Sequence, residues 1–275
     1  IGLLAGSGRF PVLFAETARQ LGRSVVCVGI RDEAPLELIP LVDRFQWAGI
    51  LKLGHMIRCF RREGVSEIVM AGKIQKTKLF LPFAIARNLP DVRTIRFFFR
   101  HWRRRMDNRD DTLLLSVIDE FGRDGLTFTS ALDYCPELLV REGILTRRTL
   151  SNREEDDIRF GWTMAKELGR LDIGQSVVVK DQAVLAVEAI EGTDRAILRA
   201  GDLCRKGGFT VVKVAKPQQD MRFDVPTIGQ NTIQTIHKAG GRVLAIEAGK
   251  TILLDEAATL ALADRLGITI VARAA

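Results

Sequence analysis

The feature that most constrains the fold is an alternation of short apolar runs with glycine turns and amphipathic helices, which starts at the first residue. In chain order a strand, a glycine turn, a helix, a strand, a second helix and a third strand are expected at 1–5, 6–8, 12–21, 24–28, 52–63 and 67–71. This order is typical of an open parallel sheet with helical crossovers. We therefore predict an α/β protein whose N-terminal domain, residues 1–132, is Rossmann-like with a parallel sheet.

The glycine turns of this domain are candidates for binding an anion. Gly6-Ser7-Gly8 follows the first strand, but Pro11 stands where a dinucleotide-binding fingerprint has its third glycine, and Asp32 is the nearest acid after the second strand. This argues against an NAD-linked oxidoreductase. Ser7, the Gly6 and Gly8 amides and Gly72-Lys73 stay candidates for a phosphate or sugar contact, because ligands of open α/β sheets bind at carboxyl ends of strands. A turn that only closes a strand onto a helix is the alternative.

A second α/β domain, with a mixed sheet, is predicted for residues 133–275. After a long helix at 154–171 the pattern gives a hairpin at 176–188, and helices then alternate with strands to the end of the chain. Polar residues follow the hairpin directly: Glu191, Gly192, Thr193 and Asp194. Such residues at a helix N-terminus can bind a phosphate, a sugar hydroxyl or a metal ion. Helix capping alone also explains Thr193 and Asp194.

The segment from Lys213 to Gly229 is the strongest functional candidate. It follows a strand predicted at 210–215 and contains Lys213, Lys216 and Arg222 for phosphate oxygens, with Asp220 or Asp224 for a divalent cation or a water. Loops of this length in compact domains are usually functional or disordered, and this one has no low-complexity character. We therefore expect chemistry on an anionic phosphate ester.

Composition limits the classes of function. The net charge of +7 favours anionic partners. The three histidines lack metal-ligand spacing and the four cysteines form no C-x-x-C pair, so we expect reduced thiols in a reducing compartment. No signal peptide and no run of about 18 apolar residues is recognisable, so we expect neither export nor a membrane span.

Residues 83–105 combine aromatic residues with a dense run of arginines between Arg96 and Arg105. The segment is compatible with a helix whose outer face is solvated, with an interfacial membrane helix, or with a nucleic-acid arm. No RNA-binding aromatic motif or helix-turn-helix accompanies it, so we expect no nucleic-acid partner.

The sequence resembles the UDP-2,3-diacylglucosamine pyrophosphatases of the LpxI type, which act in lipid A synthesis in some Gram-negative bacteria. The matching stretches are residues 2–8, 167–175, 184–194 and 213–229, and the resemblance extends over nearly the whole chain. It implies two α/β domains with the substrate between them. It also implies Mg²⁺-dependent hydrolysis of UDP-2,3-diacylglucosamine to UMP and 2,3-diacylglucosamine 1-phosphate (lipid X).

The resemblance maps the essential aspartate of the family onto Asp224, which we expect to be the catalytic residue and a ligand of Mg²⁺. The neighbouring Arg222, Pro226, Thr227 and Gly229 belong to the same matching element and are candidates for substrate binding. We expect a cytoplasmic location with peripheral contact at the cytoplasmic face of the inner membrane, and the expected partners include a homodimer.

We hypothesise that Asp224 coordinates Mg²⁺ or orients a water, while Lys213 and Lys216 neutralise charge on the phosphate oxygens. The structural alternative for Asp224 is an Asx turn before Pro226. Competing functions are a non-catalytic nucleotide-binding regulatory protein and a basic adaptor that binds membranes or RNA. The first predicts binding without Mg²⁺, and the second predicts binding that weakens steeply with salt.

Overall fold

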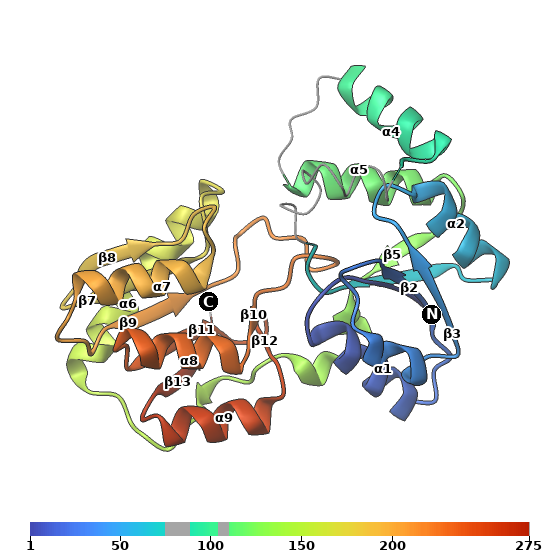
Figure 1. Ribbon diagram of the computed structural model, residues 1–275. Helices are drawn as coiled ribbons and strands as arrows, with labels where there is room; N and C mark the ends of the chain where they lie inside the picture. The colour runs from blue at the N-terminus through green and yellow to red at the C-terminus, as the bar shows by residue number, and fades with distance from the viewer. Residues whose placement is uncertain (75–88, 104–109, 275) are drawn as a thin grey trace. The chain divides into compact units, whose positions relative to one another are not determined.

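The computed structural model describes residues 1–74, 89–103 and 110–274 (Figure 1). They form two compact units, Ile1–Pro136 and Glu137–Ala275. Part of the aromatic and arginine-rich segment, residues 83–88 and 104–105, lies outside the described residues. In the described ranges no helix combines the length and apolar character needed to cross a bilayer.

Unit 1 is built around a parallel sheet with the strand order β3-β2-β1-β4-β5. Its strands are β1 (Gly2–Ala5), β2 (Val26–Ile30), β3 (Arg44–Ala48), β4 (Glu67–Ala71) and β5 (Thr127–Thr129). Its helices are α1 (Phe10–Gln20), α2 (Leu53–Arg62), α4 (Val92–Arg103) and α5 (Asp110–Gly122), with short 3-10 helices η1 (Leu36–Leu41) and η3 (Ala131–Asp133). The prediction of a Rossmann-like parallel sheet is confirmed.

The sheet of unit 1 is covered on both faces, with α1 on one and α2 and α5 on the other (Figure 1). Every residue of β1 and β2 is buried, as expected for strands between two helical layers. The chain leaves β1 towards β2 and leaves β4 towards β5, so the strand order reverses between β1 and β4. Ligands of such sheets bind at this reversal point.

Unit 2 has a larger mixed sheet with the order β6-β13-β11-β9-β7-β8. The strands are β6 (Gly143–Ile144), β7 (Ser176–Lys180), β8 (Ala183–Val187), β9 (Thr210–Lys213), β11 (Val243–Glu247) and β13 (Thr269–Arg273). A two-stranded sheet pairs β10 (Thr227–Ile228) with β12 (Ile252–Leu253). The helices are α6 (Asn152–Arg170), α7 (Thr193–Leu203), α8 (Gln230–Ala239) and α9 (Glu256–Arg265), and a 3-10 helix η4 (Pro136–Leu138) precedes them at the boundary between the units.

The central strands β9, β11 and β13 are parallel, whereas β6, β7 and β8 are antiparallel to their neighbours. The predicted mixed sheet is therefore confirmed. Alternate residues of each strand face opposite layers. Val211 packs with side chains of α7, α8 and α9, and Val212 packs with α6 on the other face.

Local signals explain several element ends in unit 2. Ser151 and Glu154 form a capping box at the start of α6, with the Ser151 N–H 2.9 Å from a Glu154 carboxylate oxygen. The β7–β8 turn places Asp181 and Gln182 at φ 49° and 58°, both left-handed. Gly174 has no room for a side chain, because a Cβ there would lie 2.0 Å from the Glu188 carbonyl oxygen.

The four cysteines form no disulfide, and Cys27, Cys59 and Cys135 are buried. Burial raises the pKa of the Cys27 thiol to about 12. These side chains therefore behave as small apolar core groups.

Candidate functional site

A row of polar residues lies along one edge of the unit 2 sheet. β9 and β11 are parallel and end there with Lys213 and Glu247. β7 is antiparallel to them and starts there, because Ser176 is the register partner of Lys213. Glu188 follows β8 at the same edge, and its N–H donates to the Ser176 carbonyl at 2.8 Å. The sheet register thus gathers four polar side chains that are distant in sequence.

Lys213 and Thr193, both predicted as substrate-binding residues, are brought together at this edge. The Lys213 ammonium donates to Thr193 Oγ1 at 3.0 Å, and Thr193 Oγ1 donates to Glu188 Oε1 at 2.8 Å. Lys213 is 7% exposed and Glu188 is 9% exposed. The other Glu188 oxygen, Oε2, is buried and has no hydrogen-bond partner among the described residues. Sequence reasoning missed Glu188, whose only signal was an acid directly after an apolar strand.

Gly192 and Asp194 shape the N-terminus of α7 beside this cluster. Gly192 precedes the helix at φ 85°, a conformation that favours glycine, and it offers no side-chain cap. The Asp194 carboxylate accepts hydrogen bonds from Asn231 Nδ2 at 2.8 Å and Thr232 Oγ1 at 3.3 Å. Asp194 therefore joins the starts of α7 and α8. Helix capping, the alternative predicted for Thr193 and Asp194, is wrong, because Gly192 is the N-cap of α7 and no side chain of the described residues caps this helix.

Glu191, the remaining candidate of that turn, forms an ion pair with Arg199 at 2.7 Å. The same guanidinium donates to the Val187 carbonyl at 2.8 Å. Arg199 thus connects α7 to the end of β8, and Glu191 is its ion-pair partner.

The loop between β9 and β10 is organised by an amide side chain that sequence reasoning did not single out. Gln219 Oε1 accepts from the Lys216 N–H at 2.8 Å, and Gln219 Nε2 donates to Asp224 Oδ2 at 2.7 Å. Lys216 Nζ in turn donates to Asp172 Oδ1 at 2.6 Å. The half-buried Asp224 carboxylate is therefore held in place by one of its two oxygens.

An Asx turn at Asp224 is ruled out by covalent chemistry. The side-chain oxygen of such a turn accepts from the N–H two residues on, and Pro226 has none. Thr227 Oγ1 instead donates to the Val225 carbonyl at 2.9 Å, and the Pro226 carbonyl accepts from Ile252. Pro226, Thr227 and Gly229 accordingly lie where β10 pairs and α8 begins.

Asp220 and Arg222 form an ion pair within the same loop. Arg222 Nη2 lies 2.6 Å from Asp220 Oδ2, and Arg222 Nε lies 3.0 Å from Oδ1. The guanidinium lowers the pKa of Asp220. Asp220 thus balances the charge of Arg222, which leaves Asp224 as the loop carboxylate better suited to a metal ion.

Glu247, also missed from the sequence, supports the start of the loop. Its side chain is fully buried and accepts from the Ala215 N–H at 2.8 Å and from Lys166 Nζ at 2.7 Å. Lys250 Nζ lies 3.0 Å from the other carboxylate oxygen. Burial would raise the pKa of Glu247, but the two ammonium groups and the amide lower it.

The glycine turns of unit 1 meet at the reversal point of its sheet. The Gly6 N–H donates to the Ala71 carbonyl at 2.8 Å, and Ser7 Oγ donates to the Lys73 carbonyl at 2.7 Å. A Cβ on Gly6 would lie 2.5 Å from the Lys73 carbonyl oxygen, and one on Gly72 would lie 2.6 Å from the Ser7 carbonyl oxygen. Both glycines are thus required by the close approach of two backbones. The Gly6 amide is already used within the sheet.

The described residues fit a magnesium ion only if a ligand supplies part of its coordination. Among residues 1–74, 89–103 and 110–274 no group of three or more His, Cys, Asp and Glu side chains could hold a metal ion. Mg²⁺ is commonly bound by one or two carboxylates together with substrate phosphates. Asp224 fits that arrangement as a single protein ligand.

Comparisons with known proteins cover almost the whole chain. A family model described as the LpxI N-terminal domain matches residues 1–138, and one described as the LpxI C-terminal domain matches residues 141–271. The chain is 33% identical over 277 residues to the UDP-2,3-diacylglucosamine pyrophosphatase LpxI of Caulobacter vibrioides. That alignment covers 98% of this chain and 95% of the relative.

Proposed function

The chain belongs to the LpxI family, as the sequence resemblance predicted, and we propose that it is a hydrolase of the UDP-2,3-diacylglucosamine diphosphate in lipid A synthesis. Its products would be UMP and 2,3-diacylglucosamine 1-phosphate (lipid X). The observation that carries the proposal is the match over 98% of the chain to a relative named for this activity. A non-catalytic regulatory protein is correspondingly disfavoured.

We assign the diphosphate to the polar row of unit 2 and to the loop that follows β9. Lys213 presents a buried ammonium group beside Thr193 at the start of α7, where helix amides favour an anion. Lys216 supplies a second ammonium group from the loop. Asp224, held by Gln219, orients the attacking water or one phosphate oxygen.

Asp224 would also hold Mg²⁺ together with the substrate phosphates. The ion, when bound, would supply Lewis-acid stabilisation of charge on the phosphate oxygens. We therefore expect hydrolysis to depend on Mg²⁺, because a carboxylate such as that of Asp224 is a typical ligand of this ion.

Unit 1 would contact the nucleotide through the Gly8 amide and the exposed Lys73 ammonium at its reversal point. The position of the substrate between the units stays a prediction. So do a cytoplasmic location with peripheral membrane contact and a homodimer.

The test is incubation of the purified protein with UDP-2,3-diacylglucosamine in isotopically labelled water, with and without Mg²⁺. We expect UMP and lipid X, label in one of them, and little turnover without the ion. Asp224→Asn should lower turnover about a hundredfold or more, as expected for loss of a group that acts on the reacting phosphate. Near-normal turnover of the folded variant would remove Asp224 from the site.

Asp220→Asn is the matched control, because it removes the same charge from the same loop. It breaks the ion pair with Arg222 and leaves the hydrogen bond between Gln219 and the Asp224 carboxylate in place, so we expect a loss of about tenfold at most. Equal losses in the two variants would show that general disturbance of the loop, and not the Asp224 carboxylate itself, causes the effect.

A further inference from the structure

Helix α4 of unit 1 has an exposed apolar face that nothing in the proposed chemistry uses. Thr94, Phe97 and His101 are its buried residues. At about 100° per residue these three lie on one side of the helix. The large apolar side chains on the other side are 43–77% exposed: Val92, Ile95, Phe98, Phe99 and Trp102.

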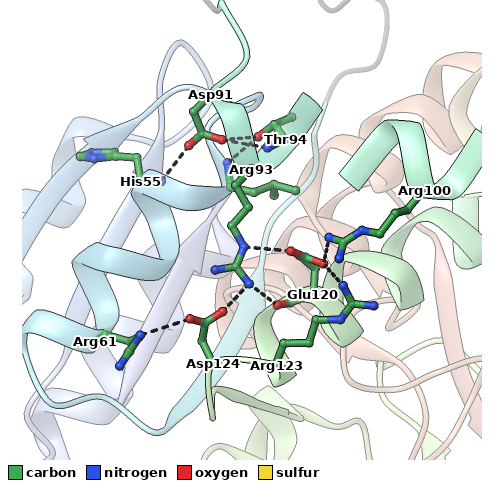
Figure 2. A network of polar contacts seen from close by, with 10 residues as sticks. His55, Arg61, Asp91, Arg93, Thr94, Arg100, Glu120, Arg123 and Asp124 are labelled. Carbon is green, nitrogen blue, oxygen red and sulfur yellow. Dashed lines mark hydrogen bonds and ion pairs between the residues drawn. The ribbon is translucent and has the colours of Figure 1, made fainter. Parts of the chain in front are cut away.

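Ion pairs fix this orientation of α4, as Figure 2 shows. Arg93 and Arg100 converge on the buried Glu120 of α5, at 2.8 Å and 2.6 Å. Arg93 also contacts Asp124, and Arg123 approaches Glu120 at 3.1 Å. A rotation of α4 that buried its aromatic side chains would take Arg93 and Arg100 away from Glu120, which is costly for a buried carboxylate.

A second set of contacts holds the start of α4 against α2. Thr94 Oγ1 accepts from the Leu53 N–H at 3.0 Å, and Asp91 Oδ2 accepts from the His55 N–H at 3.0 Å (Figure 2). Thr94 lies on the buried side of α4, and Asp91 directly precedes the helix. The outward direction of the aromatic face is therefore determined at both ends of the described helix.

Basic side chains run beside the apolar face. Arg96 and Arg103 are exposed and lie next to Val92 on the surface of the helix. The Arg103 guanidinium lies 5.8 Å from the centre of the Phe99 ring. The helix sequence contains no acidic residue. Aromatic side chains flanked by arginines are typical of helices that lie in the interface of an anionic bilayer.

We propose that this face of α4, made of Val92, Ile95, Phe98, Phe99 and Trp102 with Arg96 and Arg103, docks onto the surface of an anionic phospholipid bilayer. The aromatic rings enter the headgroup region and the arginines contact lipid phosphates. Two copies of the face would bring like charges together, which disfavours self-association. A nucleic-acid backbone would leave the apolar rings without a partner. The docking surface deepens the proposed function and rests on it in part, because a diacylated substrate resides in a bilayer.

The test is sedimentation of the full chain with vesicles of phosphatidylcholine, with and without phosphatidylglycerol. We expect binding only to the anionic vesicles, weakened by salt. Phe99→Ser with Trp102→Ser should lower the partition constant about tenfold or more, since two large apolar side chains leave the interface. Arg96→Gln and Arg103→Gln should each lower it about fivefold.

Leu21→Ser with Leu36→Ser is the matched control. These leucines lie in unit 1 outside α4. Their side chains are 57% and 68% exposed, which is similar to the exposed fractions of Phe99 (56%) and Trp102 (77%). The control should bind as the wild-type chain does. Equal binding by the aromatic variant, or no preference for anionic vesicles, would overturn the proposal. So would an aromatic-dependent dimer or RNA complex without vesicle binding.

Hydrolysis of detergent-solubilised substrate separates this proposal from the enzymatic one. The α4 variants should keep wild-type turnover there, because none of their changes touches the polar row or the loop of unit 2. Vesicle binding without any hydrolysis would overturn the proposed activity and leave the docking surface intact. Hydrolysis without vesicle binding would overturn the docking surface and leave the proposed activity intact.

Discussion

Replacing Glu247 by Gln tests whether the buried carboxylate positions the loop after β9. Glu247 is fully buried at the end of β11 and binds the Ala215 N–H and the Lys166 ammonium through the same oxygen. Glutamine has the same shape and keeps an acceptor oxygen, but it carries no charge. The substitution therefore isolates the electrostatic part of the contact.

The substitution leaves the Lys166 ammonium without its carboxylate partner, and this determines the loss of unfolding free energy. Removing one partner of a buried ion pair costs about 3–5 kcal/mol, because the other charge stays desolvated. The Lys166 side chain is 24% exposed and the Gln oxygen still accepts from Ala215, so we expect about 2–3 kcal/mol. Lys250→Gln is the control: this side chain is 48% exposed, and its removal should cost about 1 kcal/mol or less.

The pH dependence gives a second test with a defined sign. The pKa of Glu247 is lowered in the folded chain, so its contribution is complete above the unfolded-state pKa and is lost as the pH falls through the folded-state value. The stability difference between wild type and Glu247→Gln should thus be full at neutral pH and shrink below about pH 4.

Urea unfolding over this pH range measures the difference, and amide hydrogen exchange at Ala215 reports the local effect. A variant no less stable than Lys250→Gln would refute the reasoning. So would a stability difference that does not change with pH.

Three further substitutions test local features of unit 2. Ser151→Ala removes the capping box with Glu154 and should lower the unfolding free energy by about 1 kcal/mol in urea; Ser151→Asp should restore most of it. Gln182→Gly relieves a left-handed residue in the β7–β8 turn and should raise stability by about 0.5–1 kcal/mol; a lower melting temperature would contradict this. Gly174→Ala forces a Cβ against the Glu188 carbonyl and should cost about 1–3 kcal/mol, so an unchanged melting temperature would contradict the close contact.

The sequence predicted the elements whose signals are local. The β7–β8 hairpin was predicted from its two apolar strands, and α6 from its N-terminal capping residues; neither signal depends on tertiary contacts. β3 was missed because Arg44–Ala48 is an edge strand that is mostly half-exposed, so its residues do not form an apolar run. β10 was missed because two residues are too few to show a period.

The site was predicted only where residue type and position were both informative. Lys213 and Thr193 were named separately, and the structure brings them together. Glu188 and Glu247 escaped notice because an acid at the end of an apolar strand looks the same whether it faces solvent or is buried. Only the pairing of strands that are distant in sequence shows that Glu188 and Glu247 are buried. The contacts of Gln219 with Lys216 and Asp224 likewise depend on the path of the loop, which the sequence does not show.

The polar row also bears on how this protein can change over evolutionary time. Its members are carried by neighbouring strands, so their spacing follows from a strand separation of about 4.8 Å and not from the side chains around them. Substitutions in the adjoining loop can therefore alter which leaving group is recognised without displacing the row. Selection for a new substrate has a fixed backbone template to work from, beside a loop in which positions other than Lys216, Gln219 and Asp224 can change.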